Sequence, residues 1–478
     1  MTGGLSFTSF AFFGFVLVFA LVAQLLPARA RLGVILGANT LFVASYVPSL
    51  LALVPLLAFI AIGYLAIVSV SCAAPRKWSG LLIAAIIGLF IWLKHYPFVA
   101  GLPRLPFVYI TVGLSYILFR ILHLAFEVGD GALARPRFVH YLAYLFYFPA
   151  FLSGPIHRYE PFARDLASPE SMDAESAFAT LYRLLIGYAK VTIFGELVLM
   201  PQRQMMAALV HGGGSAAVMS AEFAIGAGLY LIFLFANFSG YTDMAIAISR
   251  LFGIILPENF NRPFTATNFQ DFWSRWHITL SDWFKIYFFN PLLKTLMRRF
   301  PSARLAPYLG VAAMFIVFVV LGAWHGASWE FMLTGVLLGF GIAANKLYQI
   351  EMTRHFGKKR YQGWTKRWLY IWGARGLTMA WVSFALIPFW LSVSEIAALL
   401  RHIGFLGWLG ALAVMTLAFA SGLFGLQWVI AQITVKRPSA LRSATDLGRI
   451  AALAAMILLL FFAVPLVNSS SDFVYKAF

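Results

Sequence analysis

Long apolar runs, separated by short polar or basic stretches, make up most of the chain. A helix needs about 20 mostly apolar residues to cross a bilayer. Runs that approach this length lie near residues 7–26, 32–50, 52–71, 79–99, 107–127, 138–155, 178–200, 218–238, 240–256, 308–323, 327–349, 369–391, 408–432 and 448–467. Several are short or adjoin without a loop. The pattern therefore predicts an all-α polytopic membrane protein with about 11 full spans and some re-entrant or interfacial helices.

Proline and glycine interrupt several runs, as at Pro149 and Gly154-Pro155. His157 and Arg158, which follow, fit either contact with an anionic donor or a solvated helix end, and the solvated end is favoured. A broken helix is tolerated in lipid only where its freed backbone groups meet protein or a water-filled cavity. The breaks therefore predict an irregular, cavity-bearing body. No repeat or linker divides the sequence, so we expect one integral-membrane domain over residues 1–478. The first run lacks the flanks of a signal peptide, which predicts a retained span.

Basic residues concentrate in short loops, and such loops stay in the cytoplasm. These loops are Arg76-Lys77, Lys294 to Arg304, Arg354 to Arg367 and Lys436 to Arg442, whereas the uncharged loop Gly212 to Ser215 fits the opposite face. Residues 306–350 then form a hairpin with its turn near Trp324-His325-Gly326. Its first arm, Leu309 to Ala323, gives about 22 Å of helix, which is less than the roughly 30 Å hydrocarbon core. We therefore expect His325 within the membrane thickness, where an ionisable side chain indicates a function.

Composition supports the membrane assignment. Hydrophobic residues make up 61% of the chain and charged residues 11%, and the mean hydropathy is +0.83. An ordinary soluble domain has about a quarter charged residues. The net charge of +18 comes from basic loops, so it indicates membrane orientation and argues against nucleic-acid binding. The single cysteine, Cys72, excludes an intramolecular disulfide, and we interpret it as a small buried apolar residue.

His325 is the strongest candidate for chemistry. The missing side chain of Gly326 lets a substrate or another helix approach the imidazole. Histidine exchanges a proton readily near neutral pH, and acyl transfer to an alcohol needs such a base because a hydroxyl is a poor nucleophile until its proton is removed. The alternative is a helix-end histidine bonded to a backbone carbonyl, and spacing alone does not separate the two.

The stretch Asn259 to Lys285 is dense in Asn, Asp, Arg, Trp and His. If residues 268–288 form one helix, His277 shares a stripe with Trp273, Leu280 and Phe284. His277 is then either part of an interfacial aromatic anchor or a cavity residue that helps to bind or activate an acyl donor.

Three further polar residues need an explanation. Asp243 lies in an apolar region, where a charge is costly unless it is paired, so we expect a structural partner for it. Asn259 and Asn261 fit either helix caps or cavity residues, and capping is favoured.

The sequence contains no HExxH, cysteine pair, phosphate-binding Gly-rich loop or Gly-x-Ser-x-Gly. It therefore indicates no metal centre, phosphate loop or serine nucleophile.

Four blocks carry a family signature. They are Ser153-Gly154-Pro155-Ile156 with Arg158-Tyr159, Phe238 to Ala245 (FSGYTDMA), Asn259 to Phe264 (NFNRPF) running into Phe272 to Ser281 (FWSRWHITLS), and Trp324-His325-Gly326. In this order they resemble the membrane-bound O-acyltransferase (MBOAT) family, and within it the bacterial branch that acetylates alginate or transfers D-alanine to teichoic acid.

The resemblance implies a ring of helices around a thin central tunnel, with core motifs in about residues 110–350. It makes His325 the catalytic tunnel histidine and His277 the second functional histidine. Candidates for donor binding or tunnel lining are Trp324, Arg275, Trp276, Asn259, Asn261 and Asp243. One departure concerns Lys285-Ile286-Tyr287, where family members usually have Arg-Asp-Tyr. Donor recognition or a partner contact is therefore expected to differ.

These inferences predict an O-acyltransferase of the bacterial inner membrane that binds no cofactor. The donor is acetyl-CoA or an acyl-carrier protein, with acetyl the first choice and D-alanyl the second. His325 acts as general base, His277 orients the donor carbonyl or relays the proton, and Arg275 attracts the anionic donor. The acceptor is an extracytoplasmic polysaccharide, and the resemblance implies an extracytoplasmic acyltransferase partner. The alternatives are a transporter with broken spans along its path and a structural scaffold.

Overall fold

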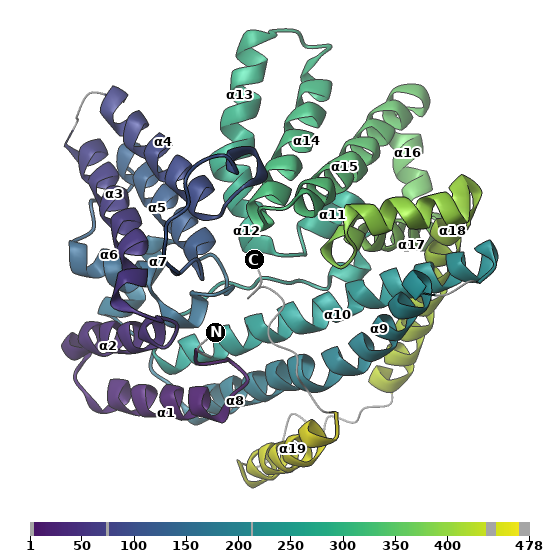
Figure 1. Cartoon of the computed structure of the whole chain (residues 1–478). Helices are drawn as coiled ribbons and strands as arrows, with labels where there is room; N and C mark the ends of the chain where they lie inside the picture. The colour runs from purple at the N-terminus through teal and green to yellow at the C-terminus, as the bar shows by residue number, and fades with distance from the viewer. Residues whose placement is uncertain (1–3, 73–75, 212–213, 436–445, 468–478) are drawn as a thin grey trace. The chain divides into compact units, whose positions relative to one another are not determined.

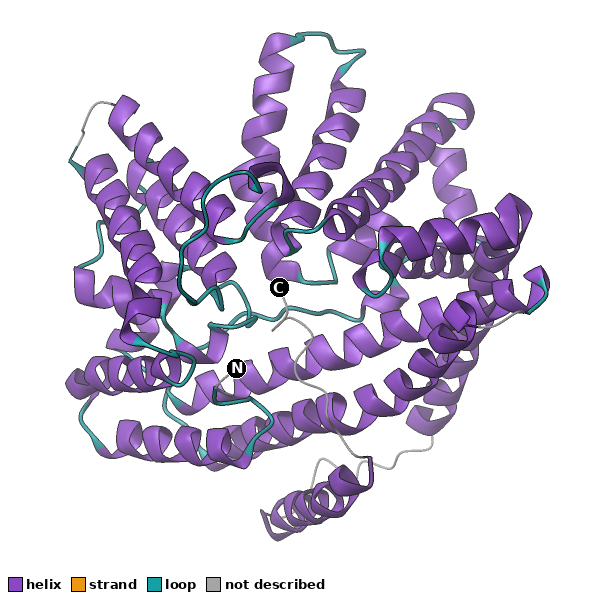
Figure 2. Cartoon of the chain, viewed as in Figure 1, coloured by secondary structure: helices purple, strands orange, loops and turns teal. Residues whose placement is uncertain are grey.

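The computed structural model describes residues 4–72, 76–211, 214–435 and 446–467. This part of the chain is helical almost throughout (Figure 2), with one isolated bridge between Phe260 and Trp276 and no strand. The all-α prediction is confirmed. The described residues group into two compact units, one within Met1–Thr192 and Asn237–Glu258 and the other within Ile193–Ala236 and Asn259–Ser469. No linker separates them, and the single-domain assignment stays a prediction.

The first unit contains the N-terminal helices (Figure 1). They are α1 (Phe10–Leu25), α2 (Arg31–Ala44), α3 (Val54–Ser71), α4 (Arg76–Leu93), α5 (Leu114–Gly129), α6 (Phe138–Leu145), α7 (Tyr159–Ala167) and α8 (Ala174–Ala189). Here α3 packs against both α4 and α5, and α1 packs against α2. Cys72, interpreted above as buried, is exposed just after α3.

The second unit is built from later helices. They are α9 (Gly195–His211), α11 (Phe269–Trp273), α12 (Ile278–Phe284), α13 (Asn290–Arg299), α14 (Ala306–His325), α15 (Trp329–Phe356), α16 (Lys358–Thr365), α17 (Trp368–Ala385), α18 (Val393–Val435) and α19 (Asp446–Val467). The short 3₁₀ and π turns are η1 (Ala28–Ala30), η2 (Leu50–Leu53), η3 (Pro97–Val99), η4 (Phe148–Ala150), η5 (Lys190–Phe194), η6 (Pro263–Thr265), η7 (Lys285–Phe289) and η8 (Ile387–Phe389). The main pairings in this unit are α14 with α15 and α17 with α18.

One long helix replaces two predicted spans. The runs 218–238 and 240–256 form α10 (Ala216–Leu251), which has 36 residues. Gly240 does not end it, because a lone glycine costs a helix only about 1 kcal/mol. Here the missing side chain is also needed, since a Cβ on Gly240 would lie 2.6 Å from the carbonyl oxygen of Gly187 in α8.

Several helices are suited to a bilayer. In the described part of the chain, 6 helices are long and apolar enough to cross a membrane. They are Leu50–Ser71, Ala174–Leu209, Ala216–Leu251, Ala306–His325, Trp329–Phe356 and Val393–Val429. Shorter apolar helices are Phe10–Leu25, Arg31–Ala44, Trp78–Leu93 and Leu453–Pro465. The multi-pass prediction is confirmed, whereas the number of full spans and the ring around a tunnel stay predictions.

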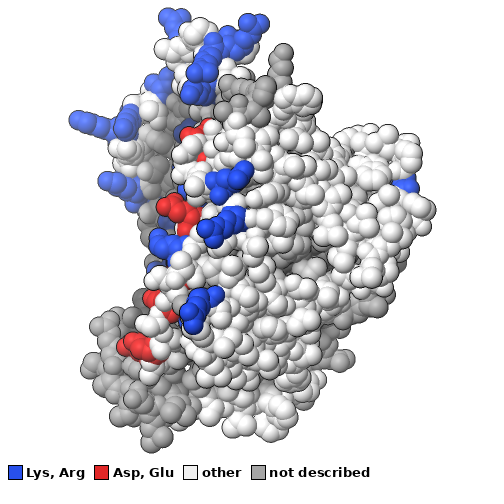
Figure 3. Space-filling model, turned by 90° about the vertical axis from the view of Figure 1, so that its left-hand side faces the viewer, with Lys and Arg blue, Asp and Glu red and all other residues white. Residues whose placement is uncertain are grey.

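Charged side chains are unevenly distributed on the face of the molecule that Figure 3 draws. On the face in Figure 3, Lys and Arg gather on one side and most of the remaining area is uncharged. The cytoplasmic orientation of the basic loops stays a prediction, and the loop Lys436 to Arg442 and the pair Gly212-Gly213 lie outside the described residues.

The predicted breaks in the first unit are satisfied by buried polar side chains. The run 138–155 yields only the 8-residue helix α6 and the turn η4. Arg120 is 1% exposed and donates to the carbonyl oxygens of Tyr144, Leu145 and Ala150 at 3.0, 2.6 and 2.7 Å. The freed carbonyls thus meet protein, as expected in lipid. His157 is buried, so its interpretation as a solvated end was wrong, whereas Arg158 is exposed.

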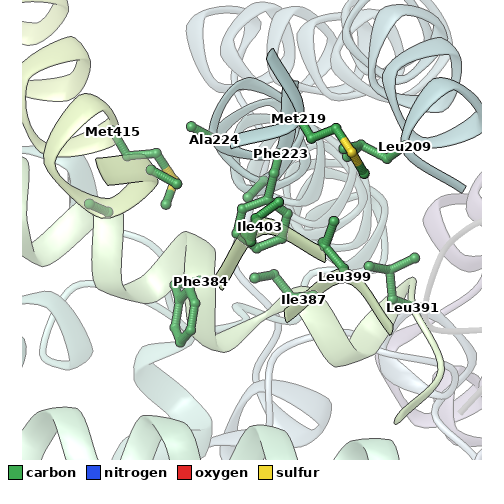
Figure 4. Close-up of a cluster of buried hydrophobic side chains, with 13 residues drawn as sticks. Leu209, Met219, Phe223, Ala224, Phe384, Ile387, Leu391, Leu399, Ile403 and Met415 are labelled. Carbon is green, nitrogen blue, oxygen red and sulfur yellow. The ribbon is translucent and has the colours of Figure 1, made fainter. Parts of the chain in front are cut away.

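The core of the second unit includes a cluster that joins α9, α10, α17, η8 and α18 (Figure 4). Its members are Leu209, Met219, Phe223, Ala224, Ala227, Ala380, Phe384, Ile387, Leu391, Leu399, Ile403, Ala411 and Met415. Burying one large apolar side chain contributes roughly 1.5–3 kcal/mol, so this cluster fixes the end of α17 and the start of α18 against the two earlier helices.

Candidate active site

His277 lies at a sharp turn between α11 and α12. Its φ of 46° and ψ of 52° are left-handed, a conformation that costs roughly 1–2 kcal/mol for a residue with a side chain. Such strain persists only where surrounding contacts maintain it, often at functional sites. The predicted continuous helix over 268–288 and its shared stripe were therefore wrong, because this left-handed residue separates the two short helices.

Asn259 holds this turn from 20 residues away. Its side-chain oxygen accepts hydrogen bonds from the backbone N–H of Thr279 at 3.2 Å and from the Thr279 hydroxyl at 2.9 Å. The same oxygen lies 3.1 Å from Nδ1 of His277. The backbone carbonyl of Asn259 accepts from the N–H of Ile278 at 3.0 Å. The predicted capping of the following helix was wrong, because Asn268 caps α11. Asn259 instead accepts from the first turn of α12, whose first residue lies well beyond Asn259 in the chain.

This contact also fixes the state of the imidazole. The Asn259 atom that accepts from the Thr279 N–H must be the amide oxygen, and an amide oxygen cannot donate. Nδ1 of neutral His277 therefore carries the proton, and Nε2 holds the lone pair. His277 is 2% exposed, so its second nitrogen faces the protein interior as a proton acceptor.

The other predicted residues of this stretch support the turn. Arg275 pairs with Asp271 at 2.6 Å, and its carbonyl accepts from the N–H of Asn261 at 2.9 Å. Trp276 is buried, with its ring stacked on Phe272 at 5.4 Å. The Asn261 side chain is exposed. That Asn261 lines a tunnel stays a prediction, and so does the attraction of an anionic donor by Arg275.

His325 is the last residue of α14, and α15 follows after a short turn, so the predicted hairpin is confirmed. The first arm is longer than predicted, because α14 has 20 residues and is therefore about 30 Å long. The shortness of the arm therefore gives no argument for the depth of His325 in a membrane. The imidazole is buried against the rings of Trp324 at 4.9 Å and Phe389 at 5.9 Å.

The structure brings the two histidines into one site. The imidazoles of His277 and His325 lie near enough to interact electrostatically. Trp273 of α11 packs against Phe318 of α14 with ring centroids 4.9 Å apart, which joins the two segments. Asn259, Arg275, Trp276 and Trp324 belong to the same unit. A proton acceptor and a second imidazole thus share a largely apolar, buried setting.

Two glycines allow the arms of the hairpin to touch. A Cβ on Gly322 would lie 2.5 Å from both the Cα of Gly335 and the carbonyl oxygen of Phe331, and a side chain on Gly326 would overlap the Phe331 ring. Gly326 thus makes room for the Phe331 ring of α15, whereas the approach of a substrate or helix to the imidazole through this gap stays a prediction.

Gly322→Ala is expected to separate α14 from α15 and to lower the free energy of unfolding by about 1–3 kcal/mol. The matched control is Gly310→Ala on the same helix, where a Cβ would meet nothing within 4 Å; it should leave stability unchanged or raise it by up to about 1 kcal/mol. The thermal midpoints of the two purified variants provide the comparison. Equal midpoints would contradict the close-packing argument.

Asp243 belongs to the first unit and is a structural residue there. Its carboxylate pairs with Arg183 at 2.9 Å and with Lys190 at 2.7 Å, and Arg183 also pairs with Glu258 at 2.6 Å. The expected structural partner is therefore confirmed. Lys190 begins the π turn η5 between α8 and α9, so the pair ties this turn to α10.

Asp243→Asn leaves Lys190 without its carboxylate, and we expect a loss of about 1–2 kcal/mol, less than for a fully buried pair because these side chains are partly exposed. Glu258→Gln, at an exposed pair, should cost at most about 1 kcal/mol. Melting of both variants, with activity normalised to folded protein, provides the test. A drop in normalised activity for Asp243→Asn alone would contradict a purely structural role.

Sequence reasoning missed three contributors to the site. Thr279 and the rings of Phe331 and Phe389 shape the surroundings of the two histidines, and the rings carry no polar signal that would mark them. Thr279 bonds to Asn259, which is 20 residues away in the chain, so no local sequence pattern marks this contact. Among the described residues, no group of three or more His, Cys, Asp and Glu side chains is placed to hold a metal ion.

Comparison with known proteins places both histidines within a region that matches a family model. The model of the MBOAT, membrane-bound O-acyltransferase family matches residues 107–386, which include both histidines. A teichoic acid D-alanyltransferase of Bacillus subtilis is 31% identical over 266 residues, or 54% of this chain and 65% of that protein. A peptidoglycan O-acetyltransferase of Helicobacter pylori is 30% identical over 252 residues, or 52% of this chain and 44% of that protein.

A probable alginate O-acetylase of Azotobacter vinelandii is 26% identical over 250 residues, or 51% of this chain and 46% of that protein. The chain thus spans about half the length of the relatives it matches. The three relatives differ in the polymer that their names contain, and two of the three names specify acetyl transfer.

Proposed function

We propose that this chain, which belongs to the membrane-bound O-acyltransferase family, is an O-acyltransferase that moves an acyl group from a cytoplasmic donor to hydroxyls of an extracytoplasmic polysaccharide. The observation that carries the proposal is the buried pair His277 and His325, with the His277 ring held by Asn259 at 3.1 Å. The membrane in this proposal is a bacterial inner membrane, which separates a cytoplasmic donor from an extracytoplasmic polysaccharide.

In the proposed reaction, His325 removes the proton of the acceptor hydroxyl as its oxygen attacks the acyl carbonyl carbon. An ester C–O bond forms, the C–S bond of the donor thioester breaks, and the proton passes to the leaving thiolate. His277 has Nε2 as an acceptor, which favours proton relay over donation to the donor carbonyl. The donor is acetyl-CoA or an acyl-carrier protein, and no bound cofactor takes part.

Acetyl is our first choice of acyl group. D-alanyl is the second candidate, supported by the teichoic acid D-alanyltransferases that reach 31% identity with this chain. An extracytoplasmic acyltransferase partner that completes the transfer is part of the proposal. Lys285-Ile286, directly after α12, stands where family members usually have Arg-Asp. Donor recognition is expected to differ at this segment, so experiment must identify the donor.

The test uses inverted membrane vesicles that contain the native chain and receive either radiolabelled acetyl-CoA or a D-alanyl-loaded carrier protein. Label on lumenal polysaccharide, or on a co-expressed extracytoplasmic partner, identifies the acyl group. Vectorial movement of substrate without covalent change would instead support a transporter. No turnover from either donor with the partner present would contradict the acyltransferase proposal.

A further inference from the structure

An apolar groove of about 570 Å³ lies in the second unit between α10 and α18. All of its lining residues are apolar, and small residues such as Gly228, Ala418 and Gly422 keep it open. A Cβ on Gly228 would lie 3.6 Å from the ring of Phe419 on the other helix. Both helices are long and apolar enough to cross a membrane, so the groove is suited to lipid chains.

The groove has the length of one bilayer leaflet. Ala224 and Met415 line it and belong to the cluster of Figure 4, and the glycine–phenylalanine contact described above follows one turn later on both helices. The helices therefore run in the same direction, and the lining residues Phe235 and Leu426 lie at one end. Each helix rises about 17 Å between its two residues, close to half of the roughly 30 Å hydrocarbon core.

Arg375 of α17 lies at this end of the groove. Its guanidinium donates to the side-chain oxygen of Gln427 at 3.1 Å. Gln427 lies one turn after Leu423, which lines the groove, so the two share a face of α18. Within the described part of the chain, Nε of Arg375 has no hydrogen-bond partner. The guanidinium thus has donors left for a ligand.

The positive charge of Arg375 is not neutralised by its neighbours. Asp271 and Arg275 both lie near enough to Arg375 to interact with it electrostatically. They pair with each other at 2.6 Å, so their charges compensate one another. A net positive charge therefore remains beside the end of an apolar groove, which suits a ligand with an anionic group and a hydrocarbon chain.

Tryptophans surround the same end. Trp368 and Trp372 pack on Phe424 with ring centroids 5.7 and 5.3 Å apart, and Trp428 is 58% exposed. Tryptophan is enriched at the level of the lipid headgroups. Directly before α17 lies the basic segment Arg354 to Arg367, which is predicted to be cytoplasmic. The cytoplasmic leaflet carries a negative surface potential from anionic lipids.

We propose that the groove binds one anionic phospholipid, with an acyl chain along α10 and α18 and the phosphate at Arg375. A guanidinium binds phosphate oxygens through charge-assisted hydrogen bonds. The chain covers apolar surface that includes the exposed side chains of Ile225 and Leu426. A membrane-spanning helix of another protein needs about 30 Å and fits this length less well. The lipid takes no part in the proposed acyl transfer.

The test measures the lipid retained by the full chain, purified in detergent from membranes that contain phosphatidylglycerol and phosphatidylethanolamine. Native mass spectrometry counts and identifies the bound lipid. Ala418→Phe fills the groove, and the matched control Ala413→Phe adds the same ring at another exposed alanine of α18, outside the lining. Arg375→Gln removes the charge, and Arg401→Gln does so at an exposed position nearer the start of α18. Thermal midpoints and size-exclusion profiles show which variants are folded.

We expect the native chain to retain one phospholipid, with phosphatidylglycerol enriched at least fivefold over its share of the membrane. Ala418→Phe should lower retention at least fivefold, and Arg375→Gln should lose the enrichment. Both controls should stay within twofold of native. Because Arg375→Gln changes no lining residue, it tests the site even if the phenylalanine variant does not fold.

Native retention by Ala418→Phe would overturn the site, and so would equal losses in both phenylalanine variants. Unchanged enrichment in Arg375→Gln would overturn the contact with the phosphate. A native chain that carries no lipid and forms a dimer, which Ala418→Phe dissociates, would assign the groove to a second copy of the chain instead.

Discussion

His325→Gln is expected to lower acyl transfer by about a thousandfold, within the range that a positioned general base supplies. Glutamine keeps hydrogen-bonding groups near the imidazole position but cannot take up the hydroxyl proton. The side chain is buried at the end of α14 and packs on Trp324 and Phe389, so a substitution of similar size should leave the hairpin folded. The measurement is label transferred per folded molecule in inverted vesicles.

His355→Gln is the matched control, because His355 is an exposed histidine near the end of the other arm of the hairpin, bonded to the carbonyl of Glu351 at 3.0 Å. It should transfer label within twofold of the native chain. Transfer by His325→Gln above about a tenth of the native rate would remove His325 as the base.

The hairpin and the long apolar helices could be predicted because their signals are local. Apolar length identifies α14 and α15, and the Trp324-His325-Gly326 turn separates two runs that are each long enough to form a helix. The same local signal failed at Gly240, where a glycine that suggests a break instead allows close contact with Gly187. Hydropathy does not contain this information, because the contact depends on a helix about 50 residues earlier.

The turn at His277 could not be predicted for a related reason. Its left-handed backbone is unfavourable by itself and persists through contacts with Asn259, which is remote in sequence. Helical periodicity treats residues 268–288 as one stripe because the aromatic spacing fits. Resemblance to a family pointed to both histidines, whereas only the fold shows which nitrogen of His277 is held.

Asn259→Ala is expected to be the most damaging substitution outside the histidine pair. It removes the oxygen that accepts from the Thr279 N–H and hydroxyl and faces His277 Nδ1. Each buried group left unsatisfied costs about 1–3 kcal/mol, so we expect the free energy of unfolding to fall by about 2–4 kcal/mol. Transfer per folded molecule should fall on the order of a hundredfold, because the imidazole loses both its orientation and its fixed tautomer.

Asn261→Ala separates this effect from a general sensitivity of the segment. Asn261 has an exposed side chain and is tied to Arg275 through its backbone at 2.9 Å, a bond that alanine keeps. Its variant should stay within about 0.5 kcal/mol of native stability and within twofold in transfer. If Asn259→Ala loses stability but keeps native transfer per folded molecule, Asn259 caps α12 and the orientation of His277 does not limit the reaction. If both alanine variants lose transfer equally, the effect belongs to the whole polar stretch, and the assignment of His277 as the proton relay fails.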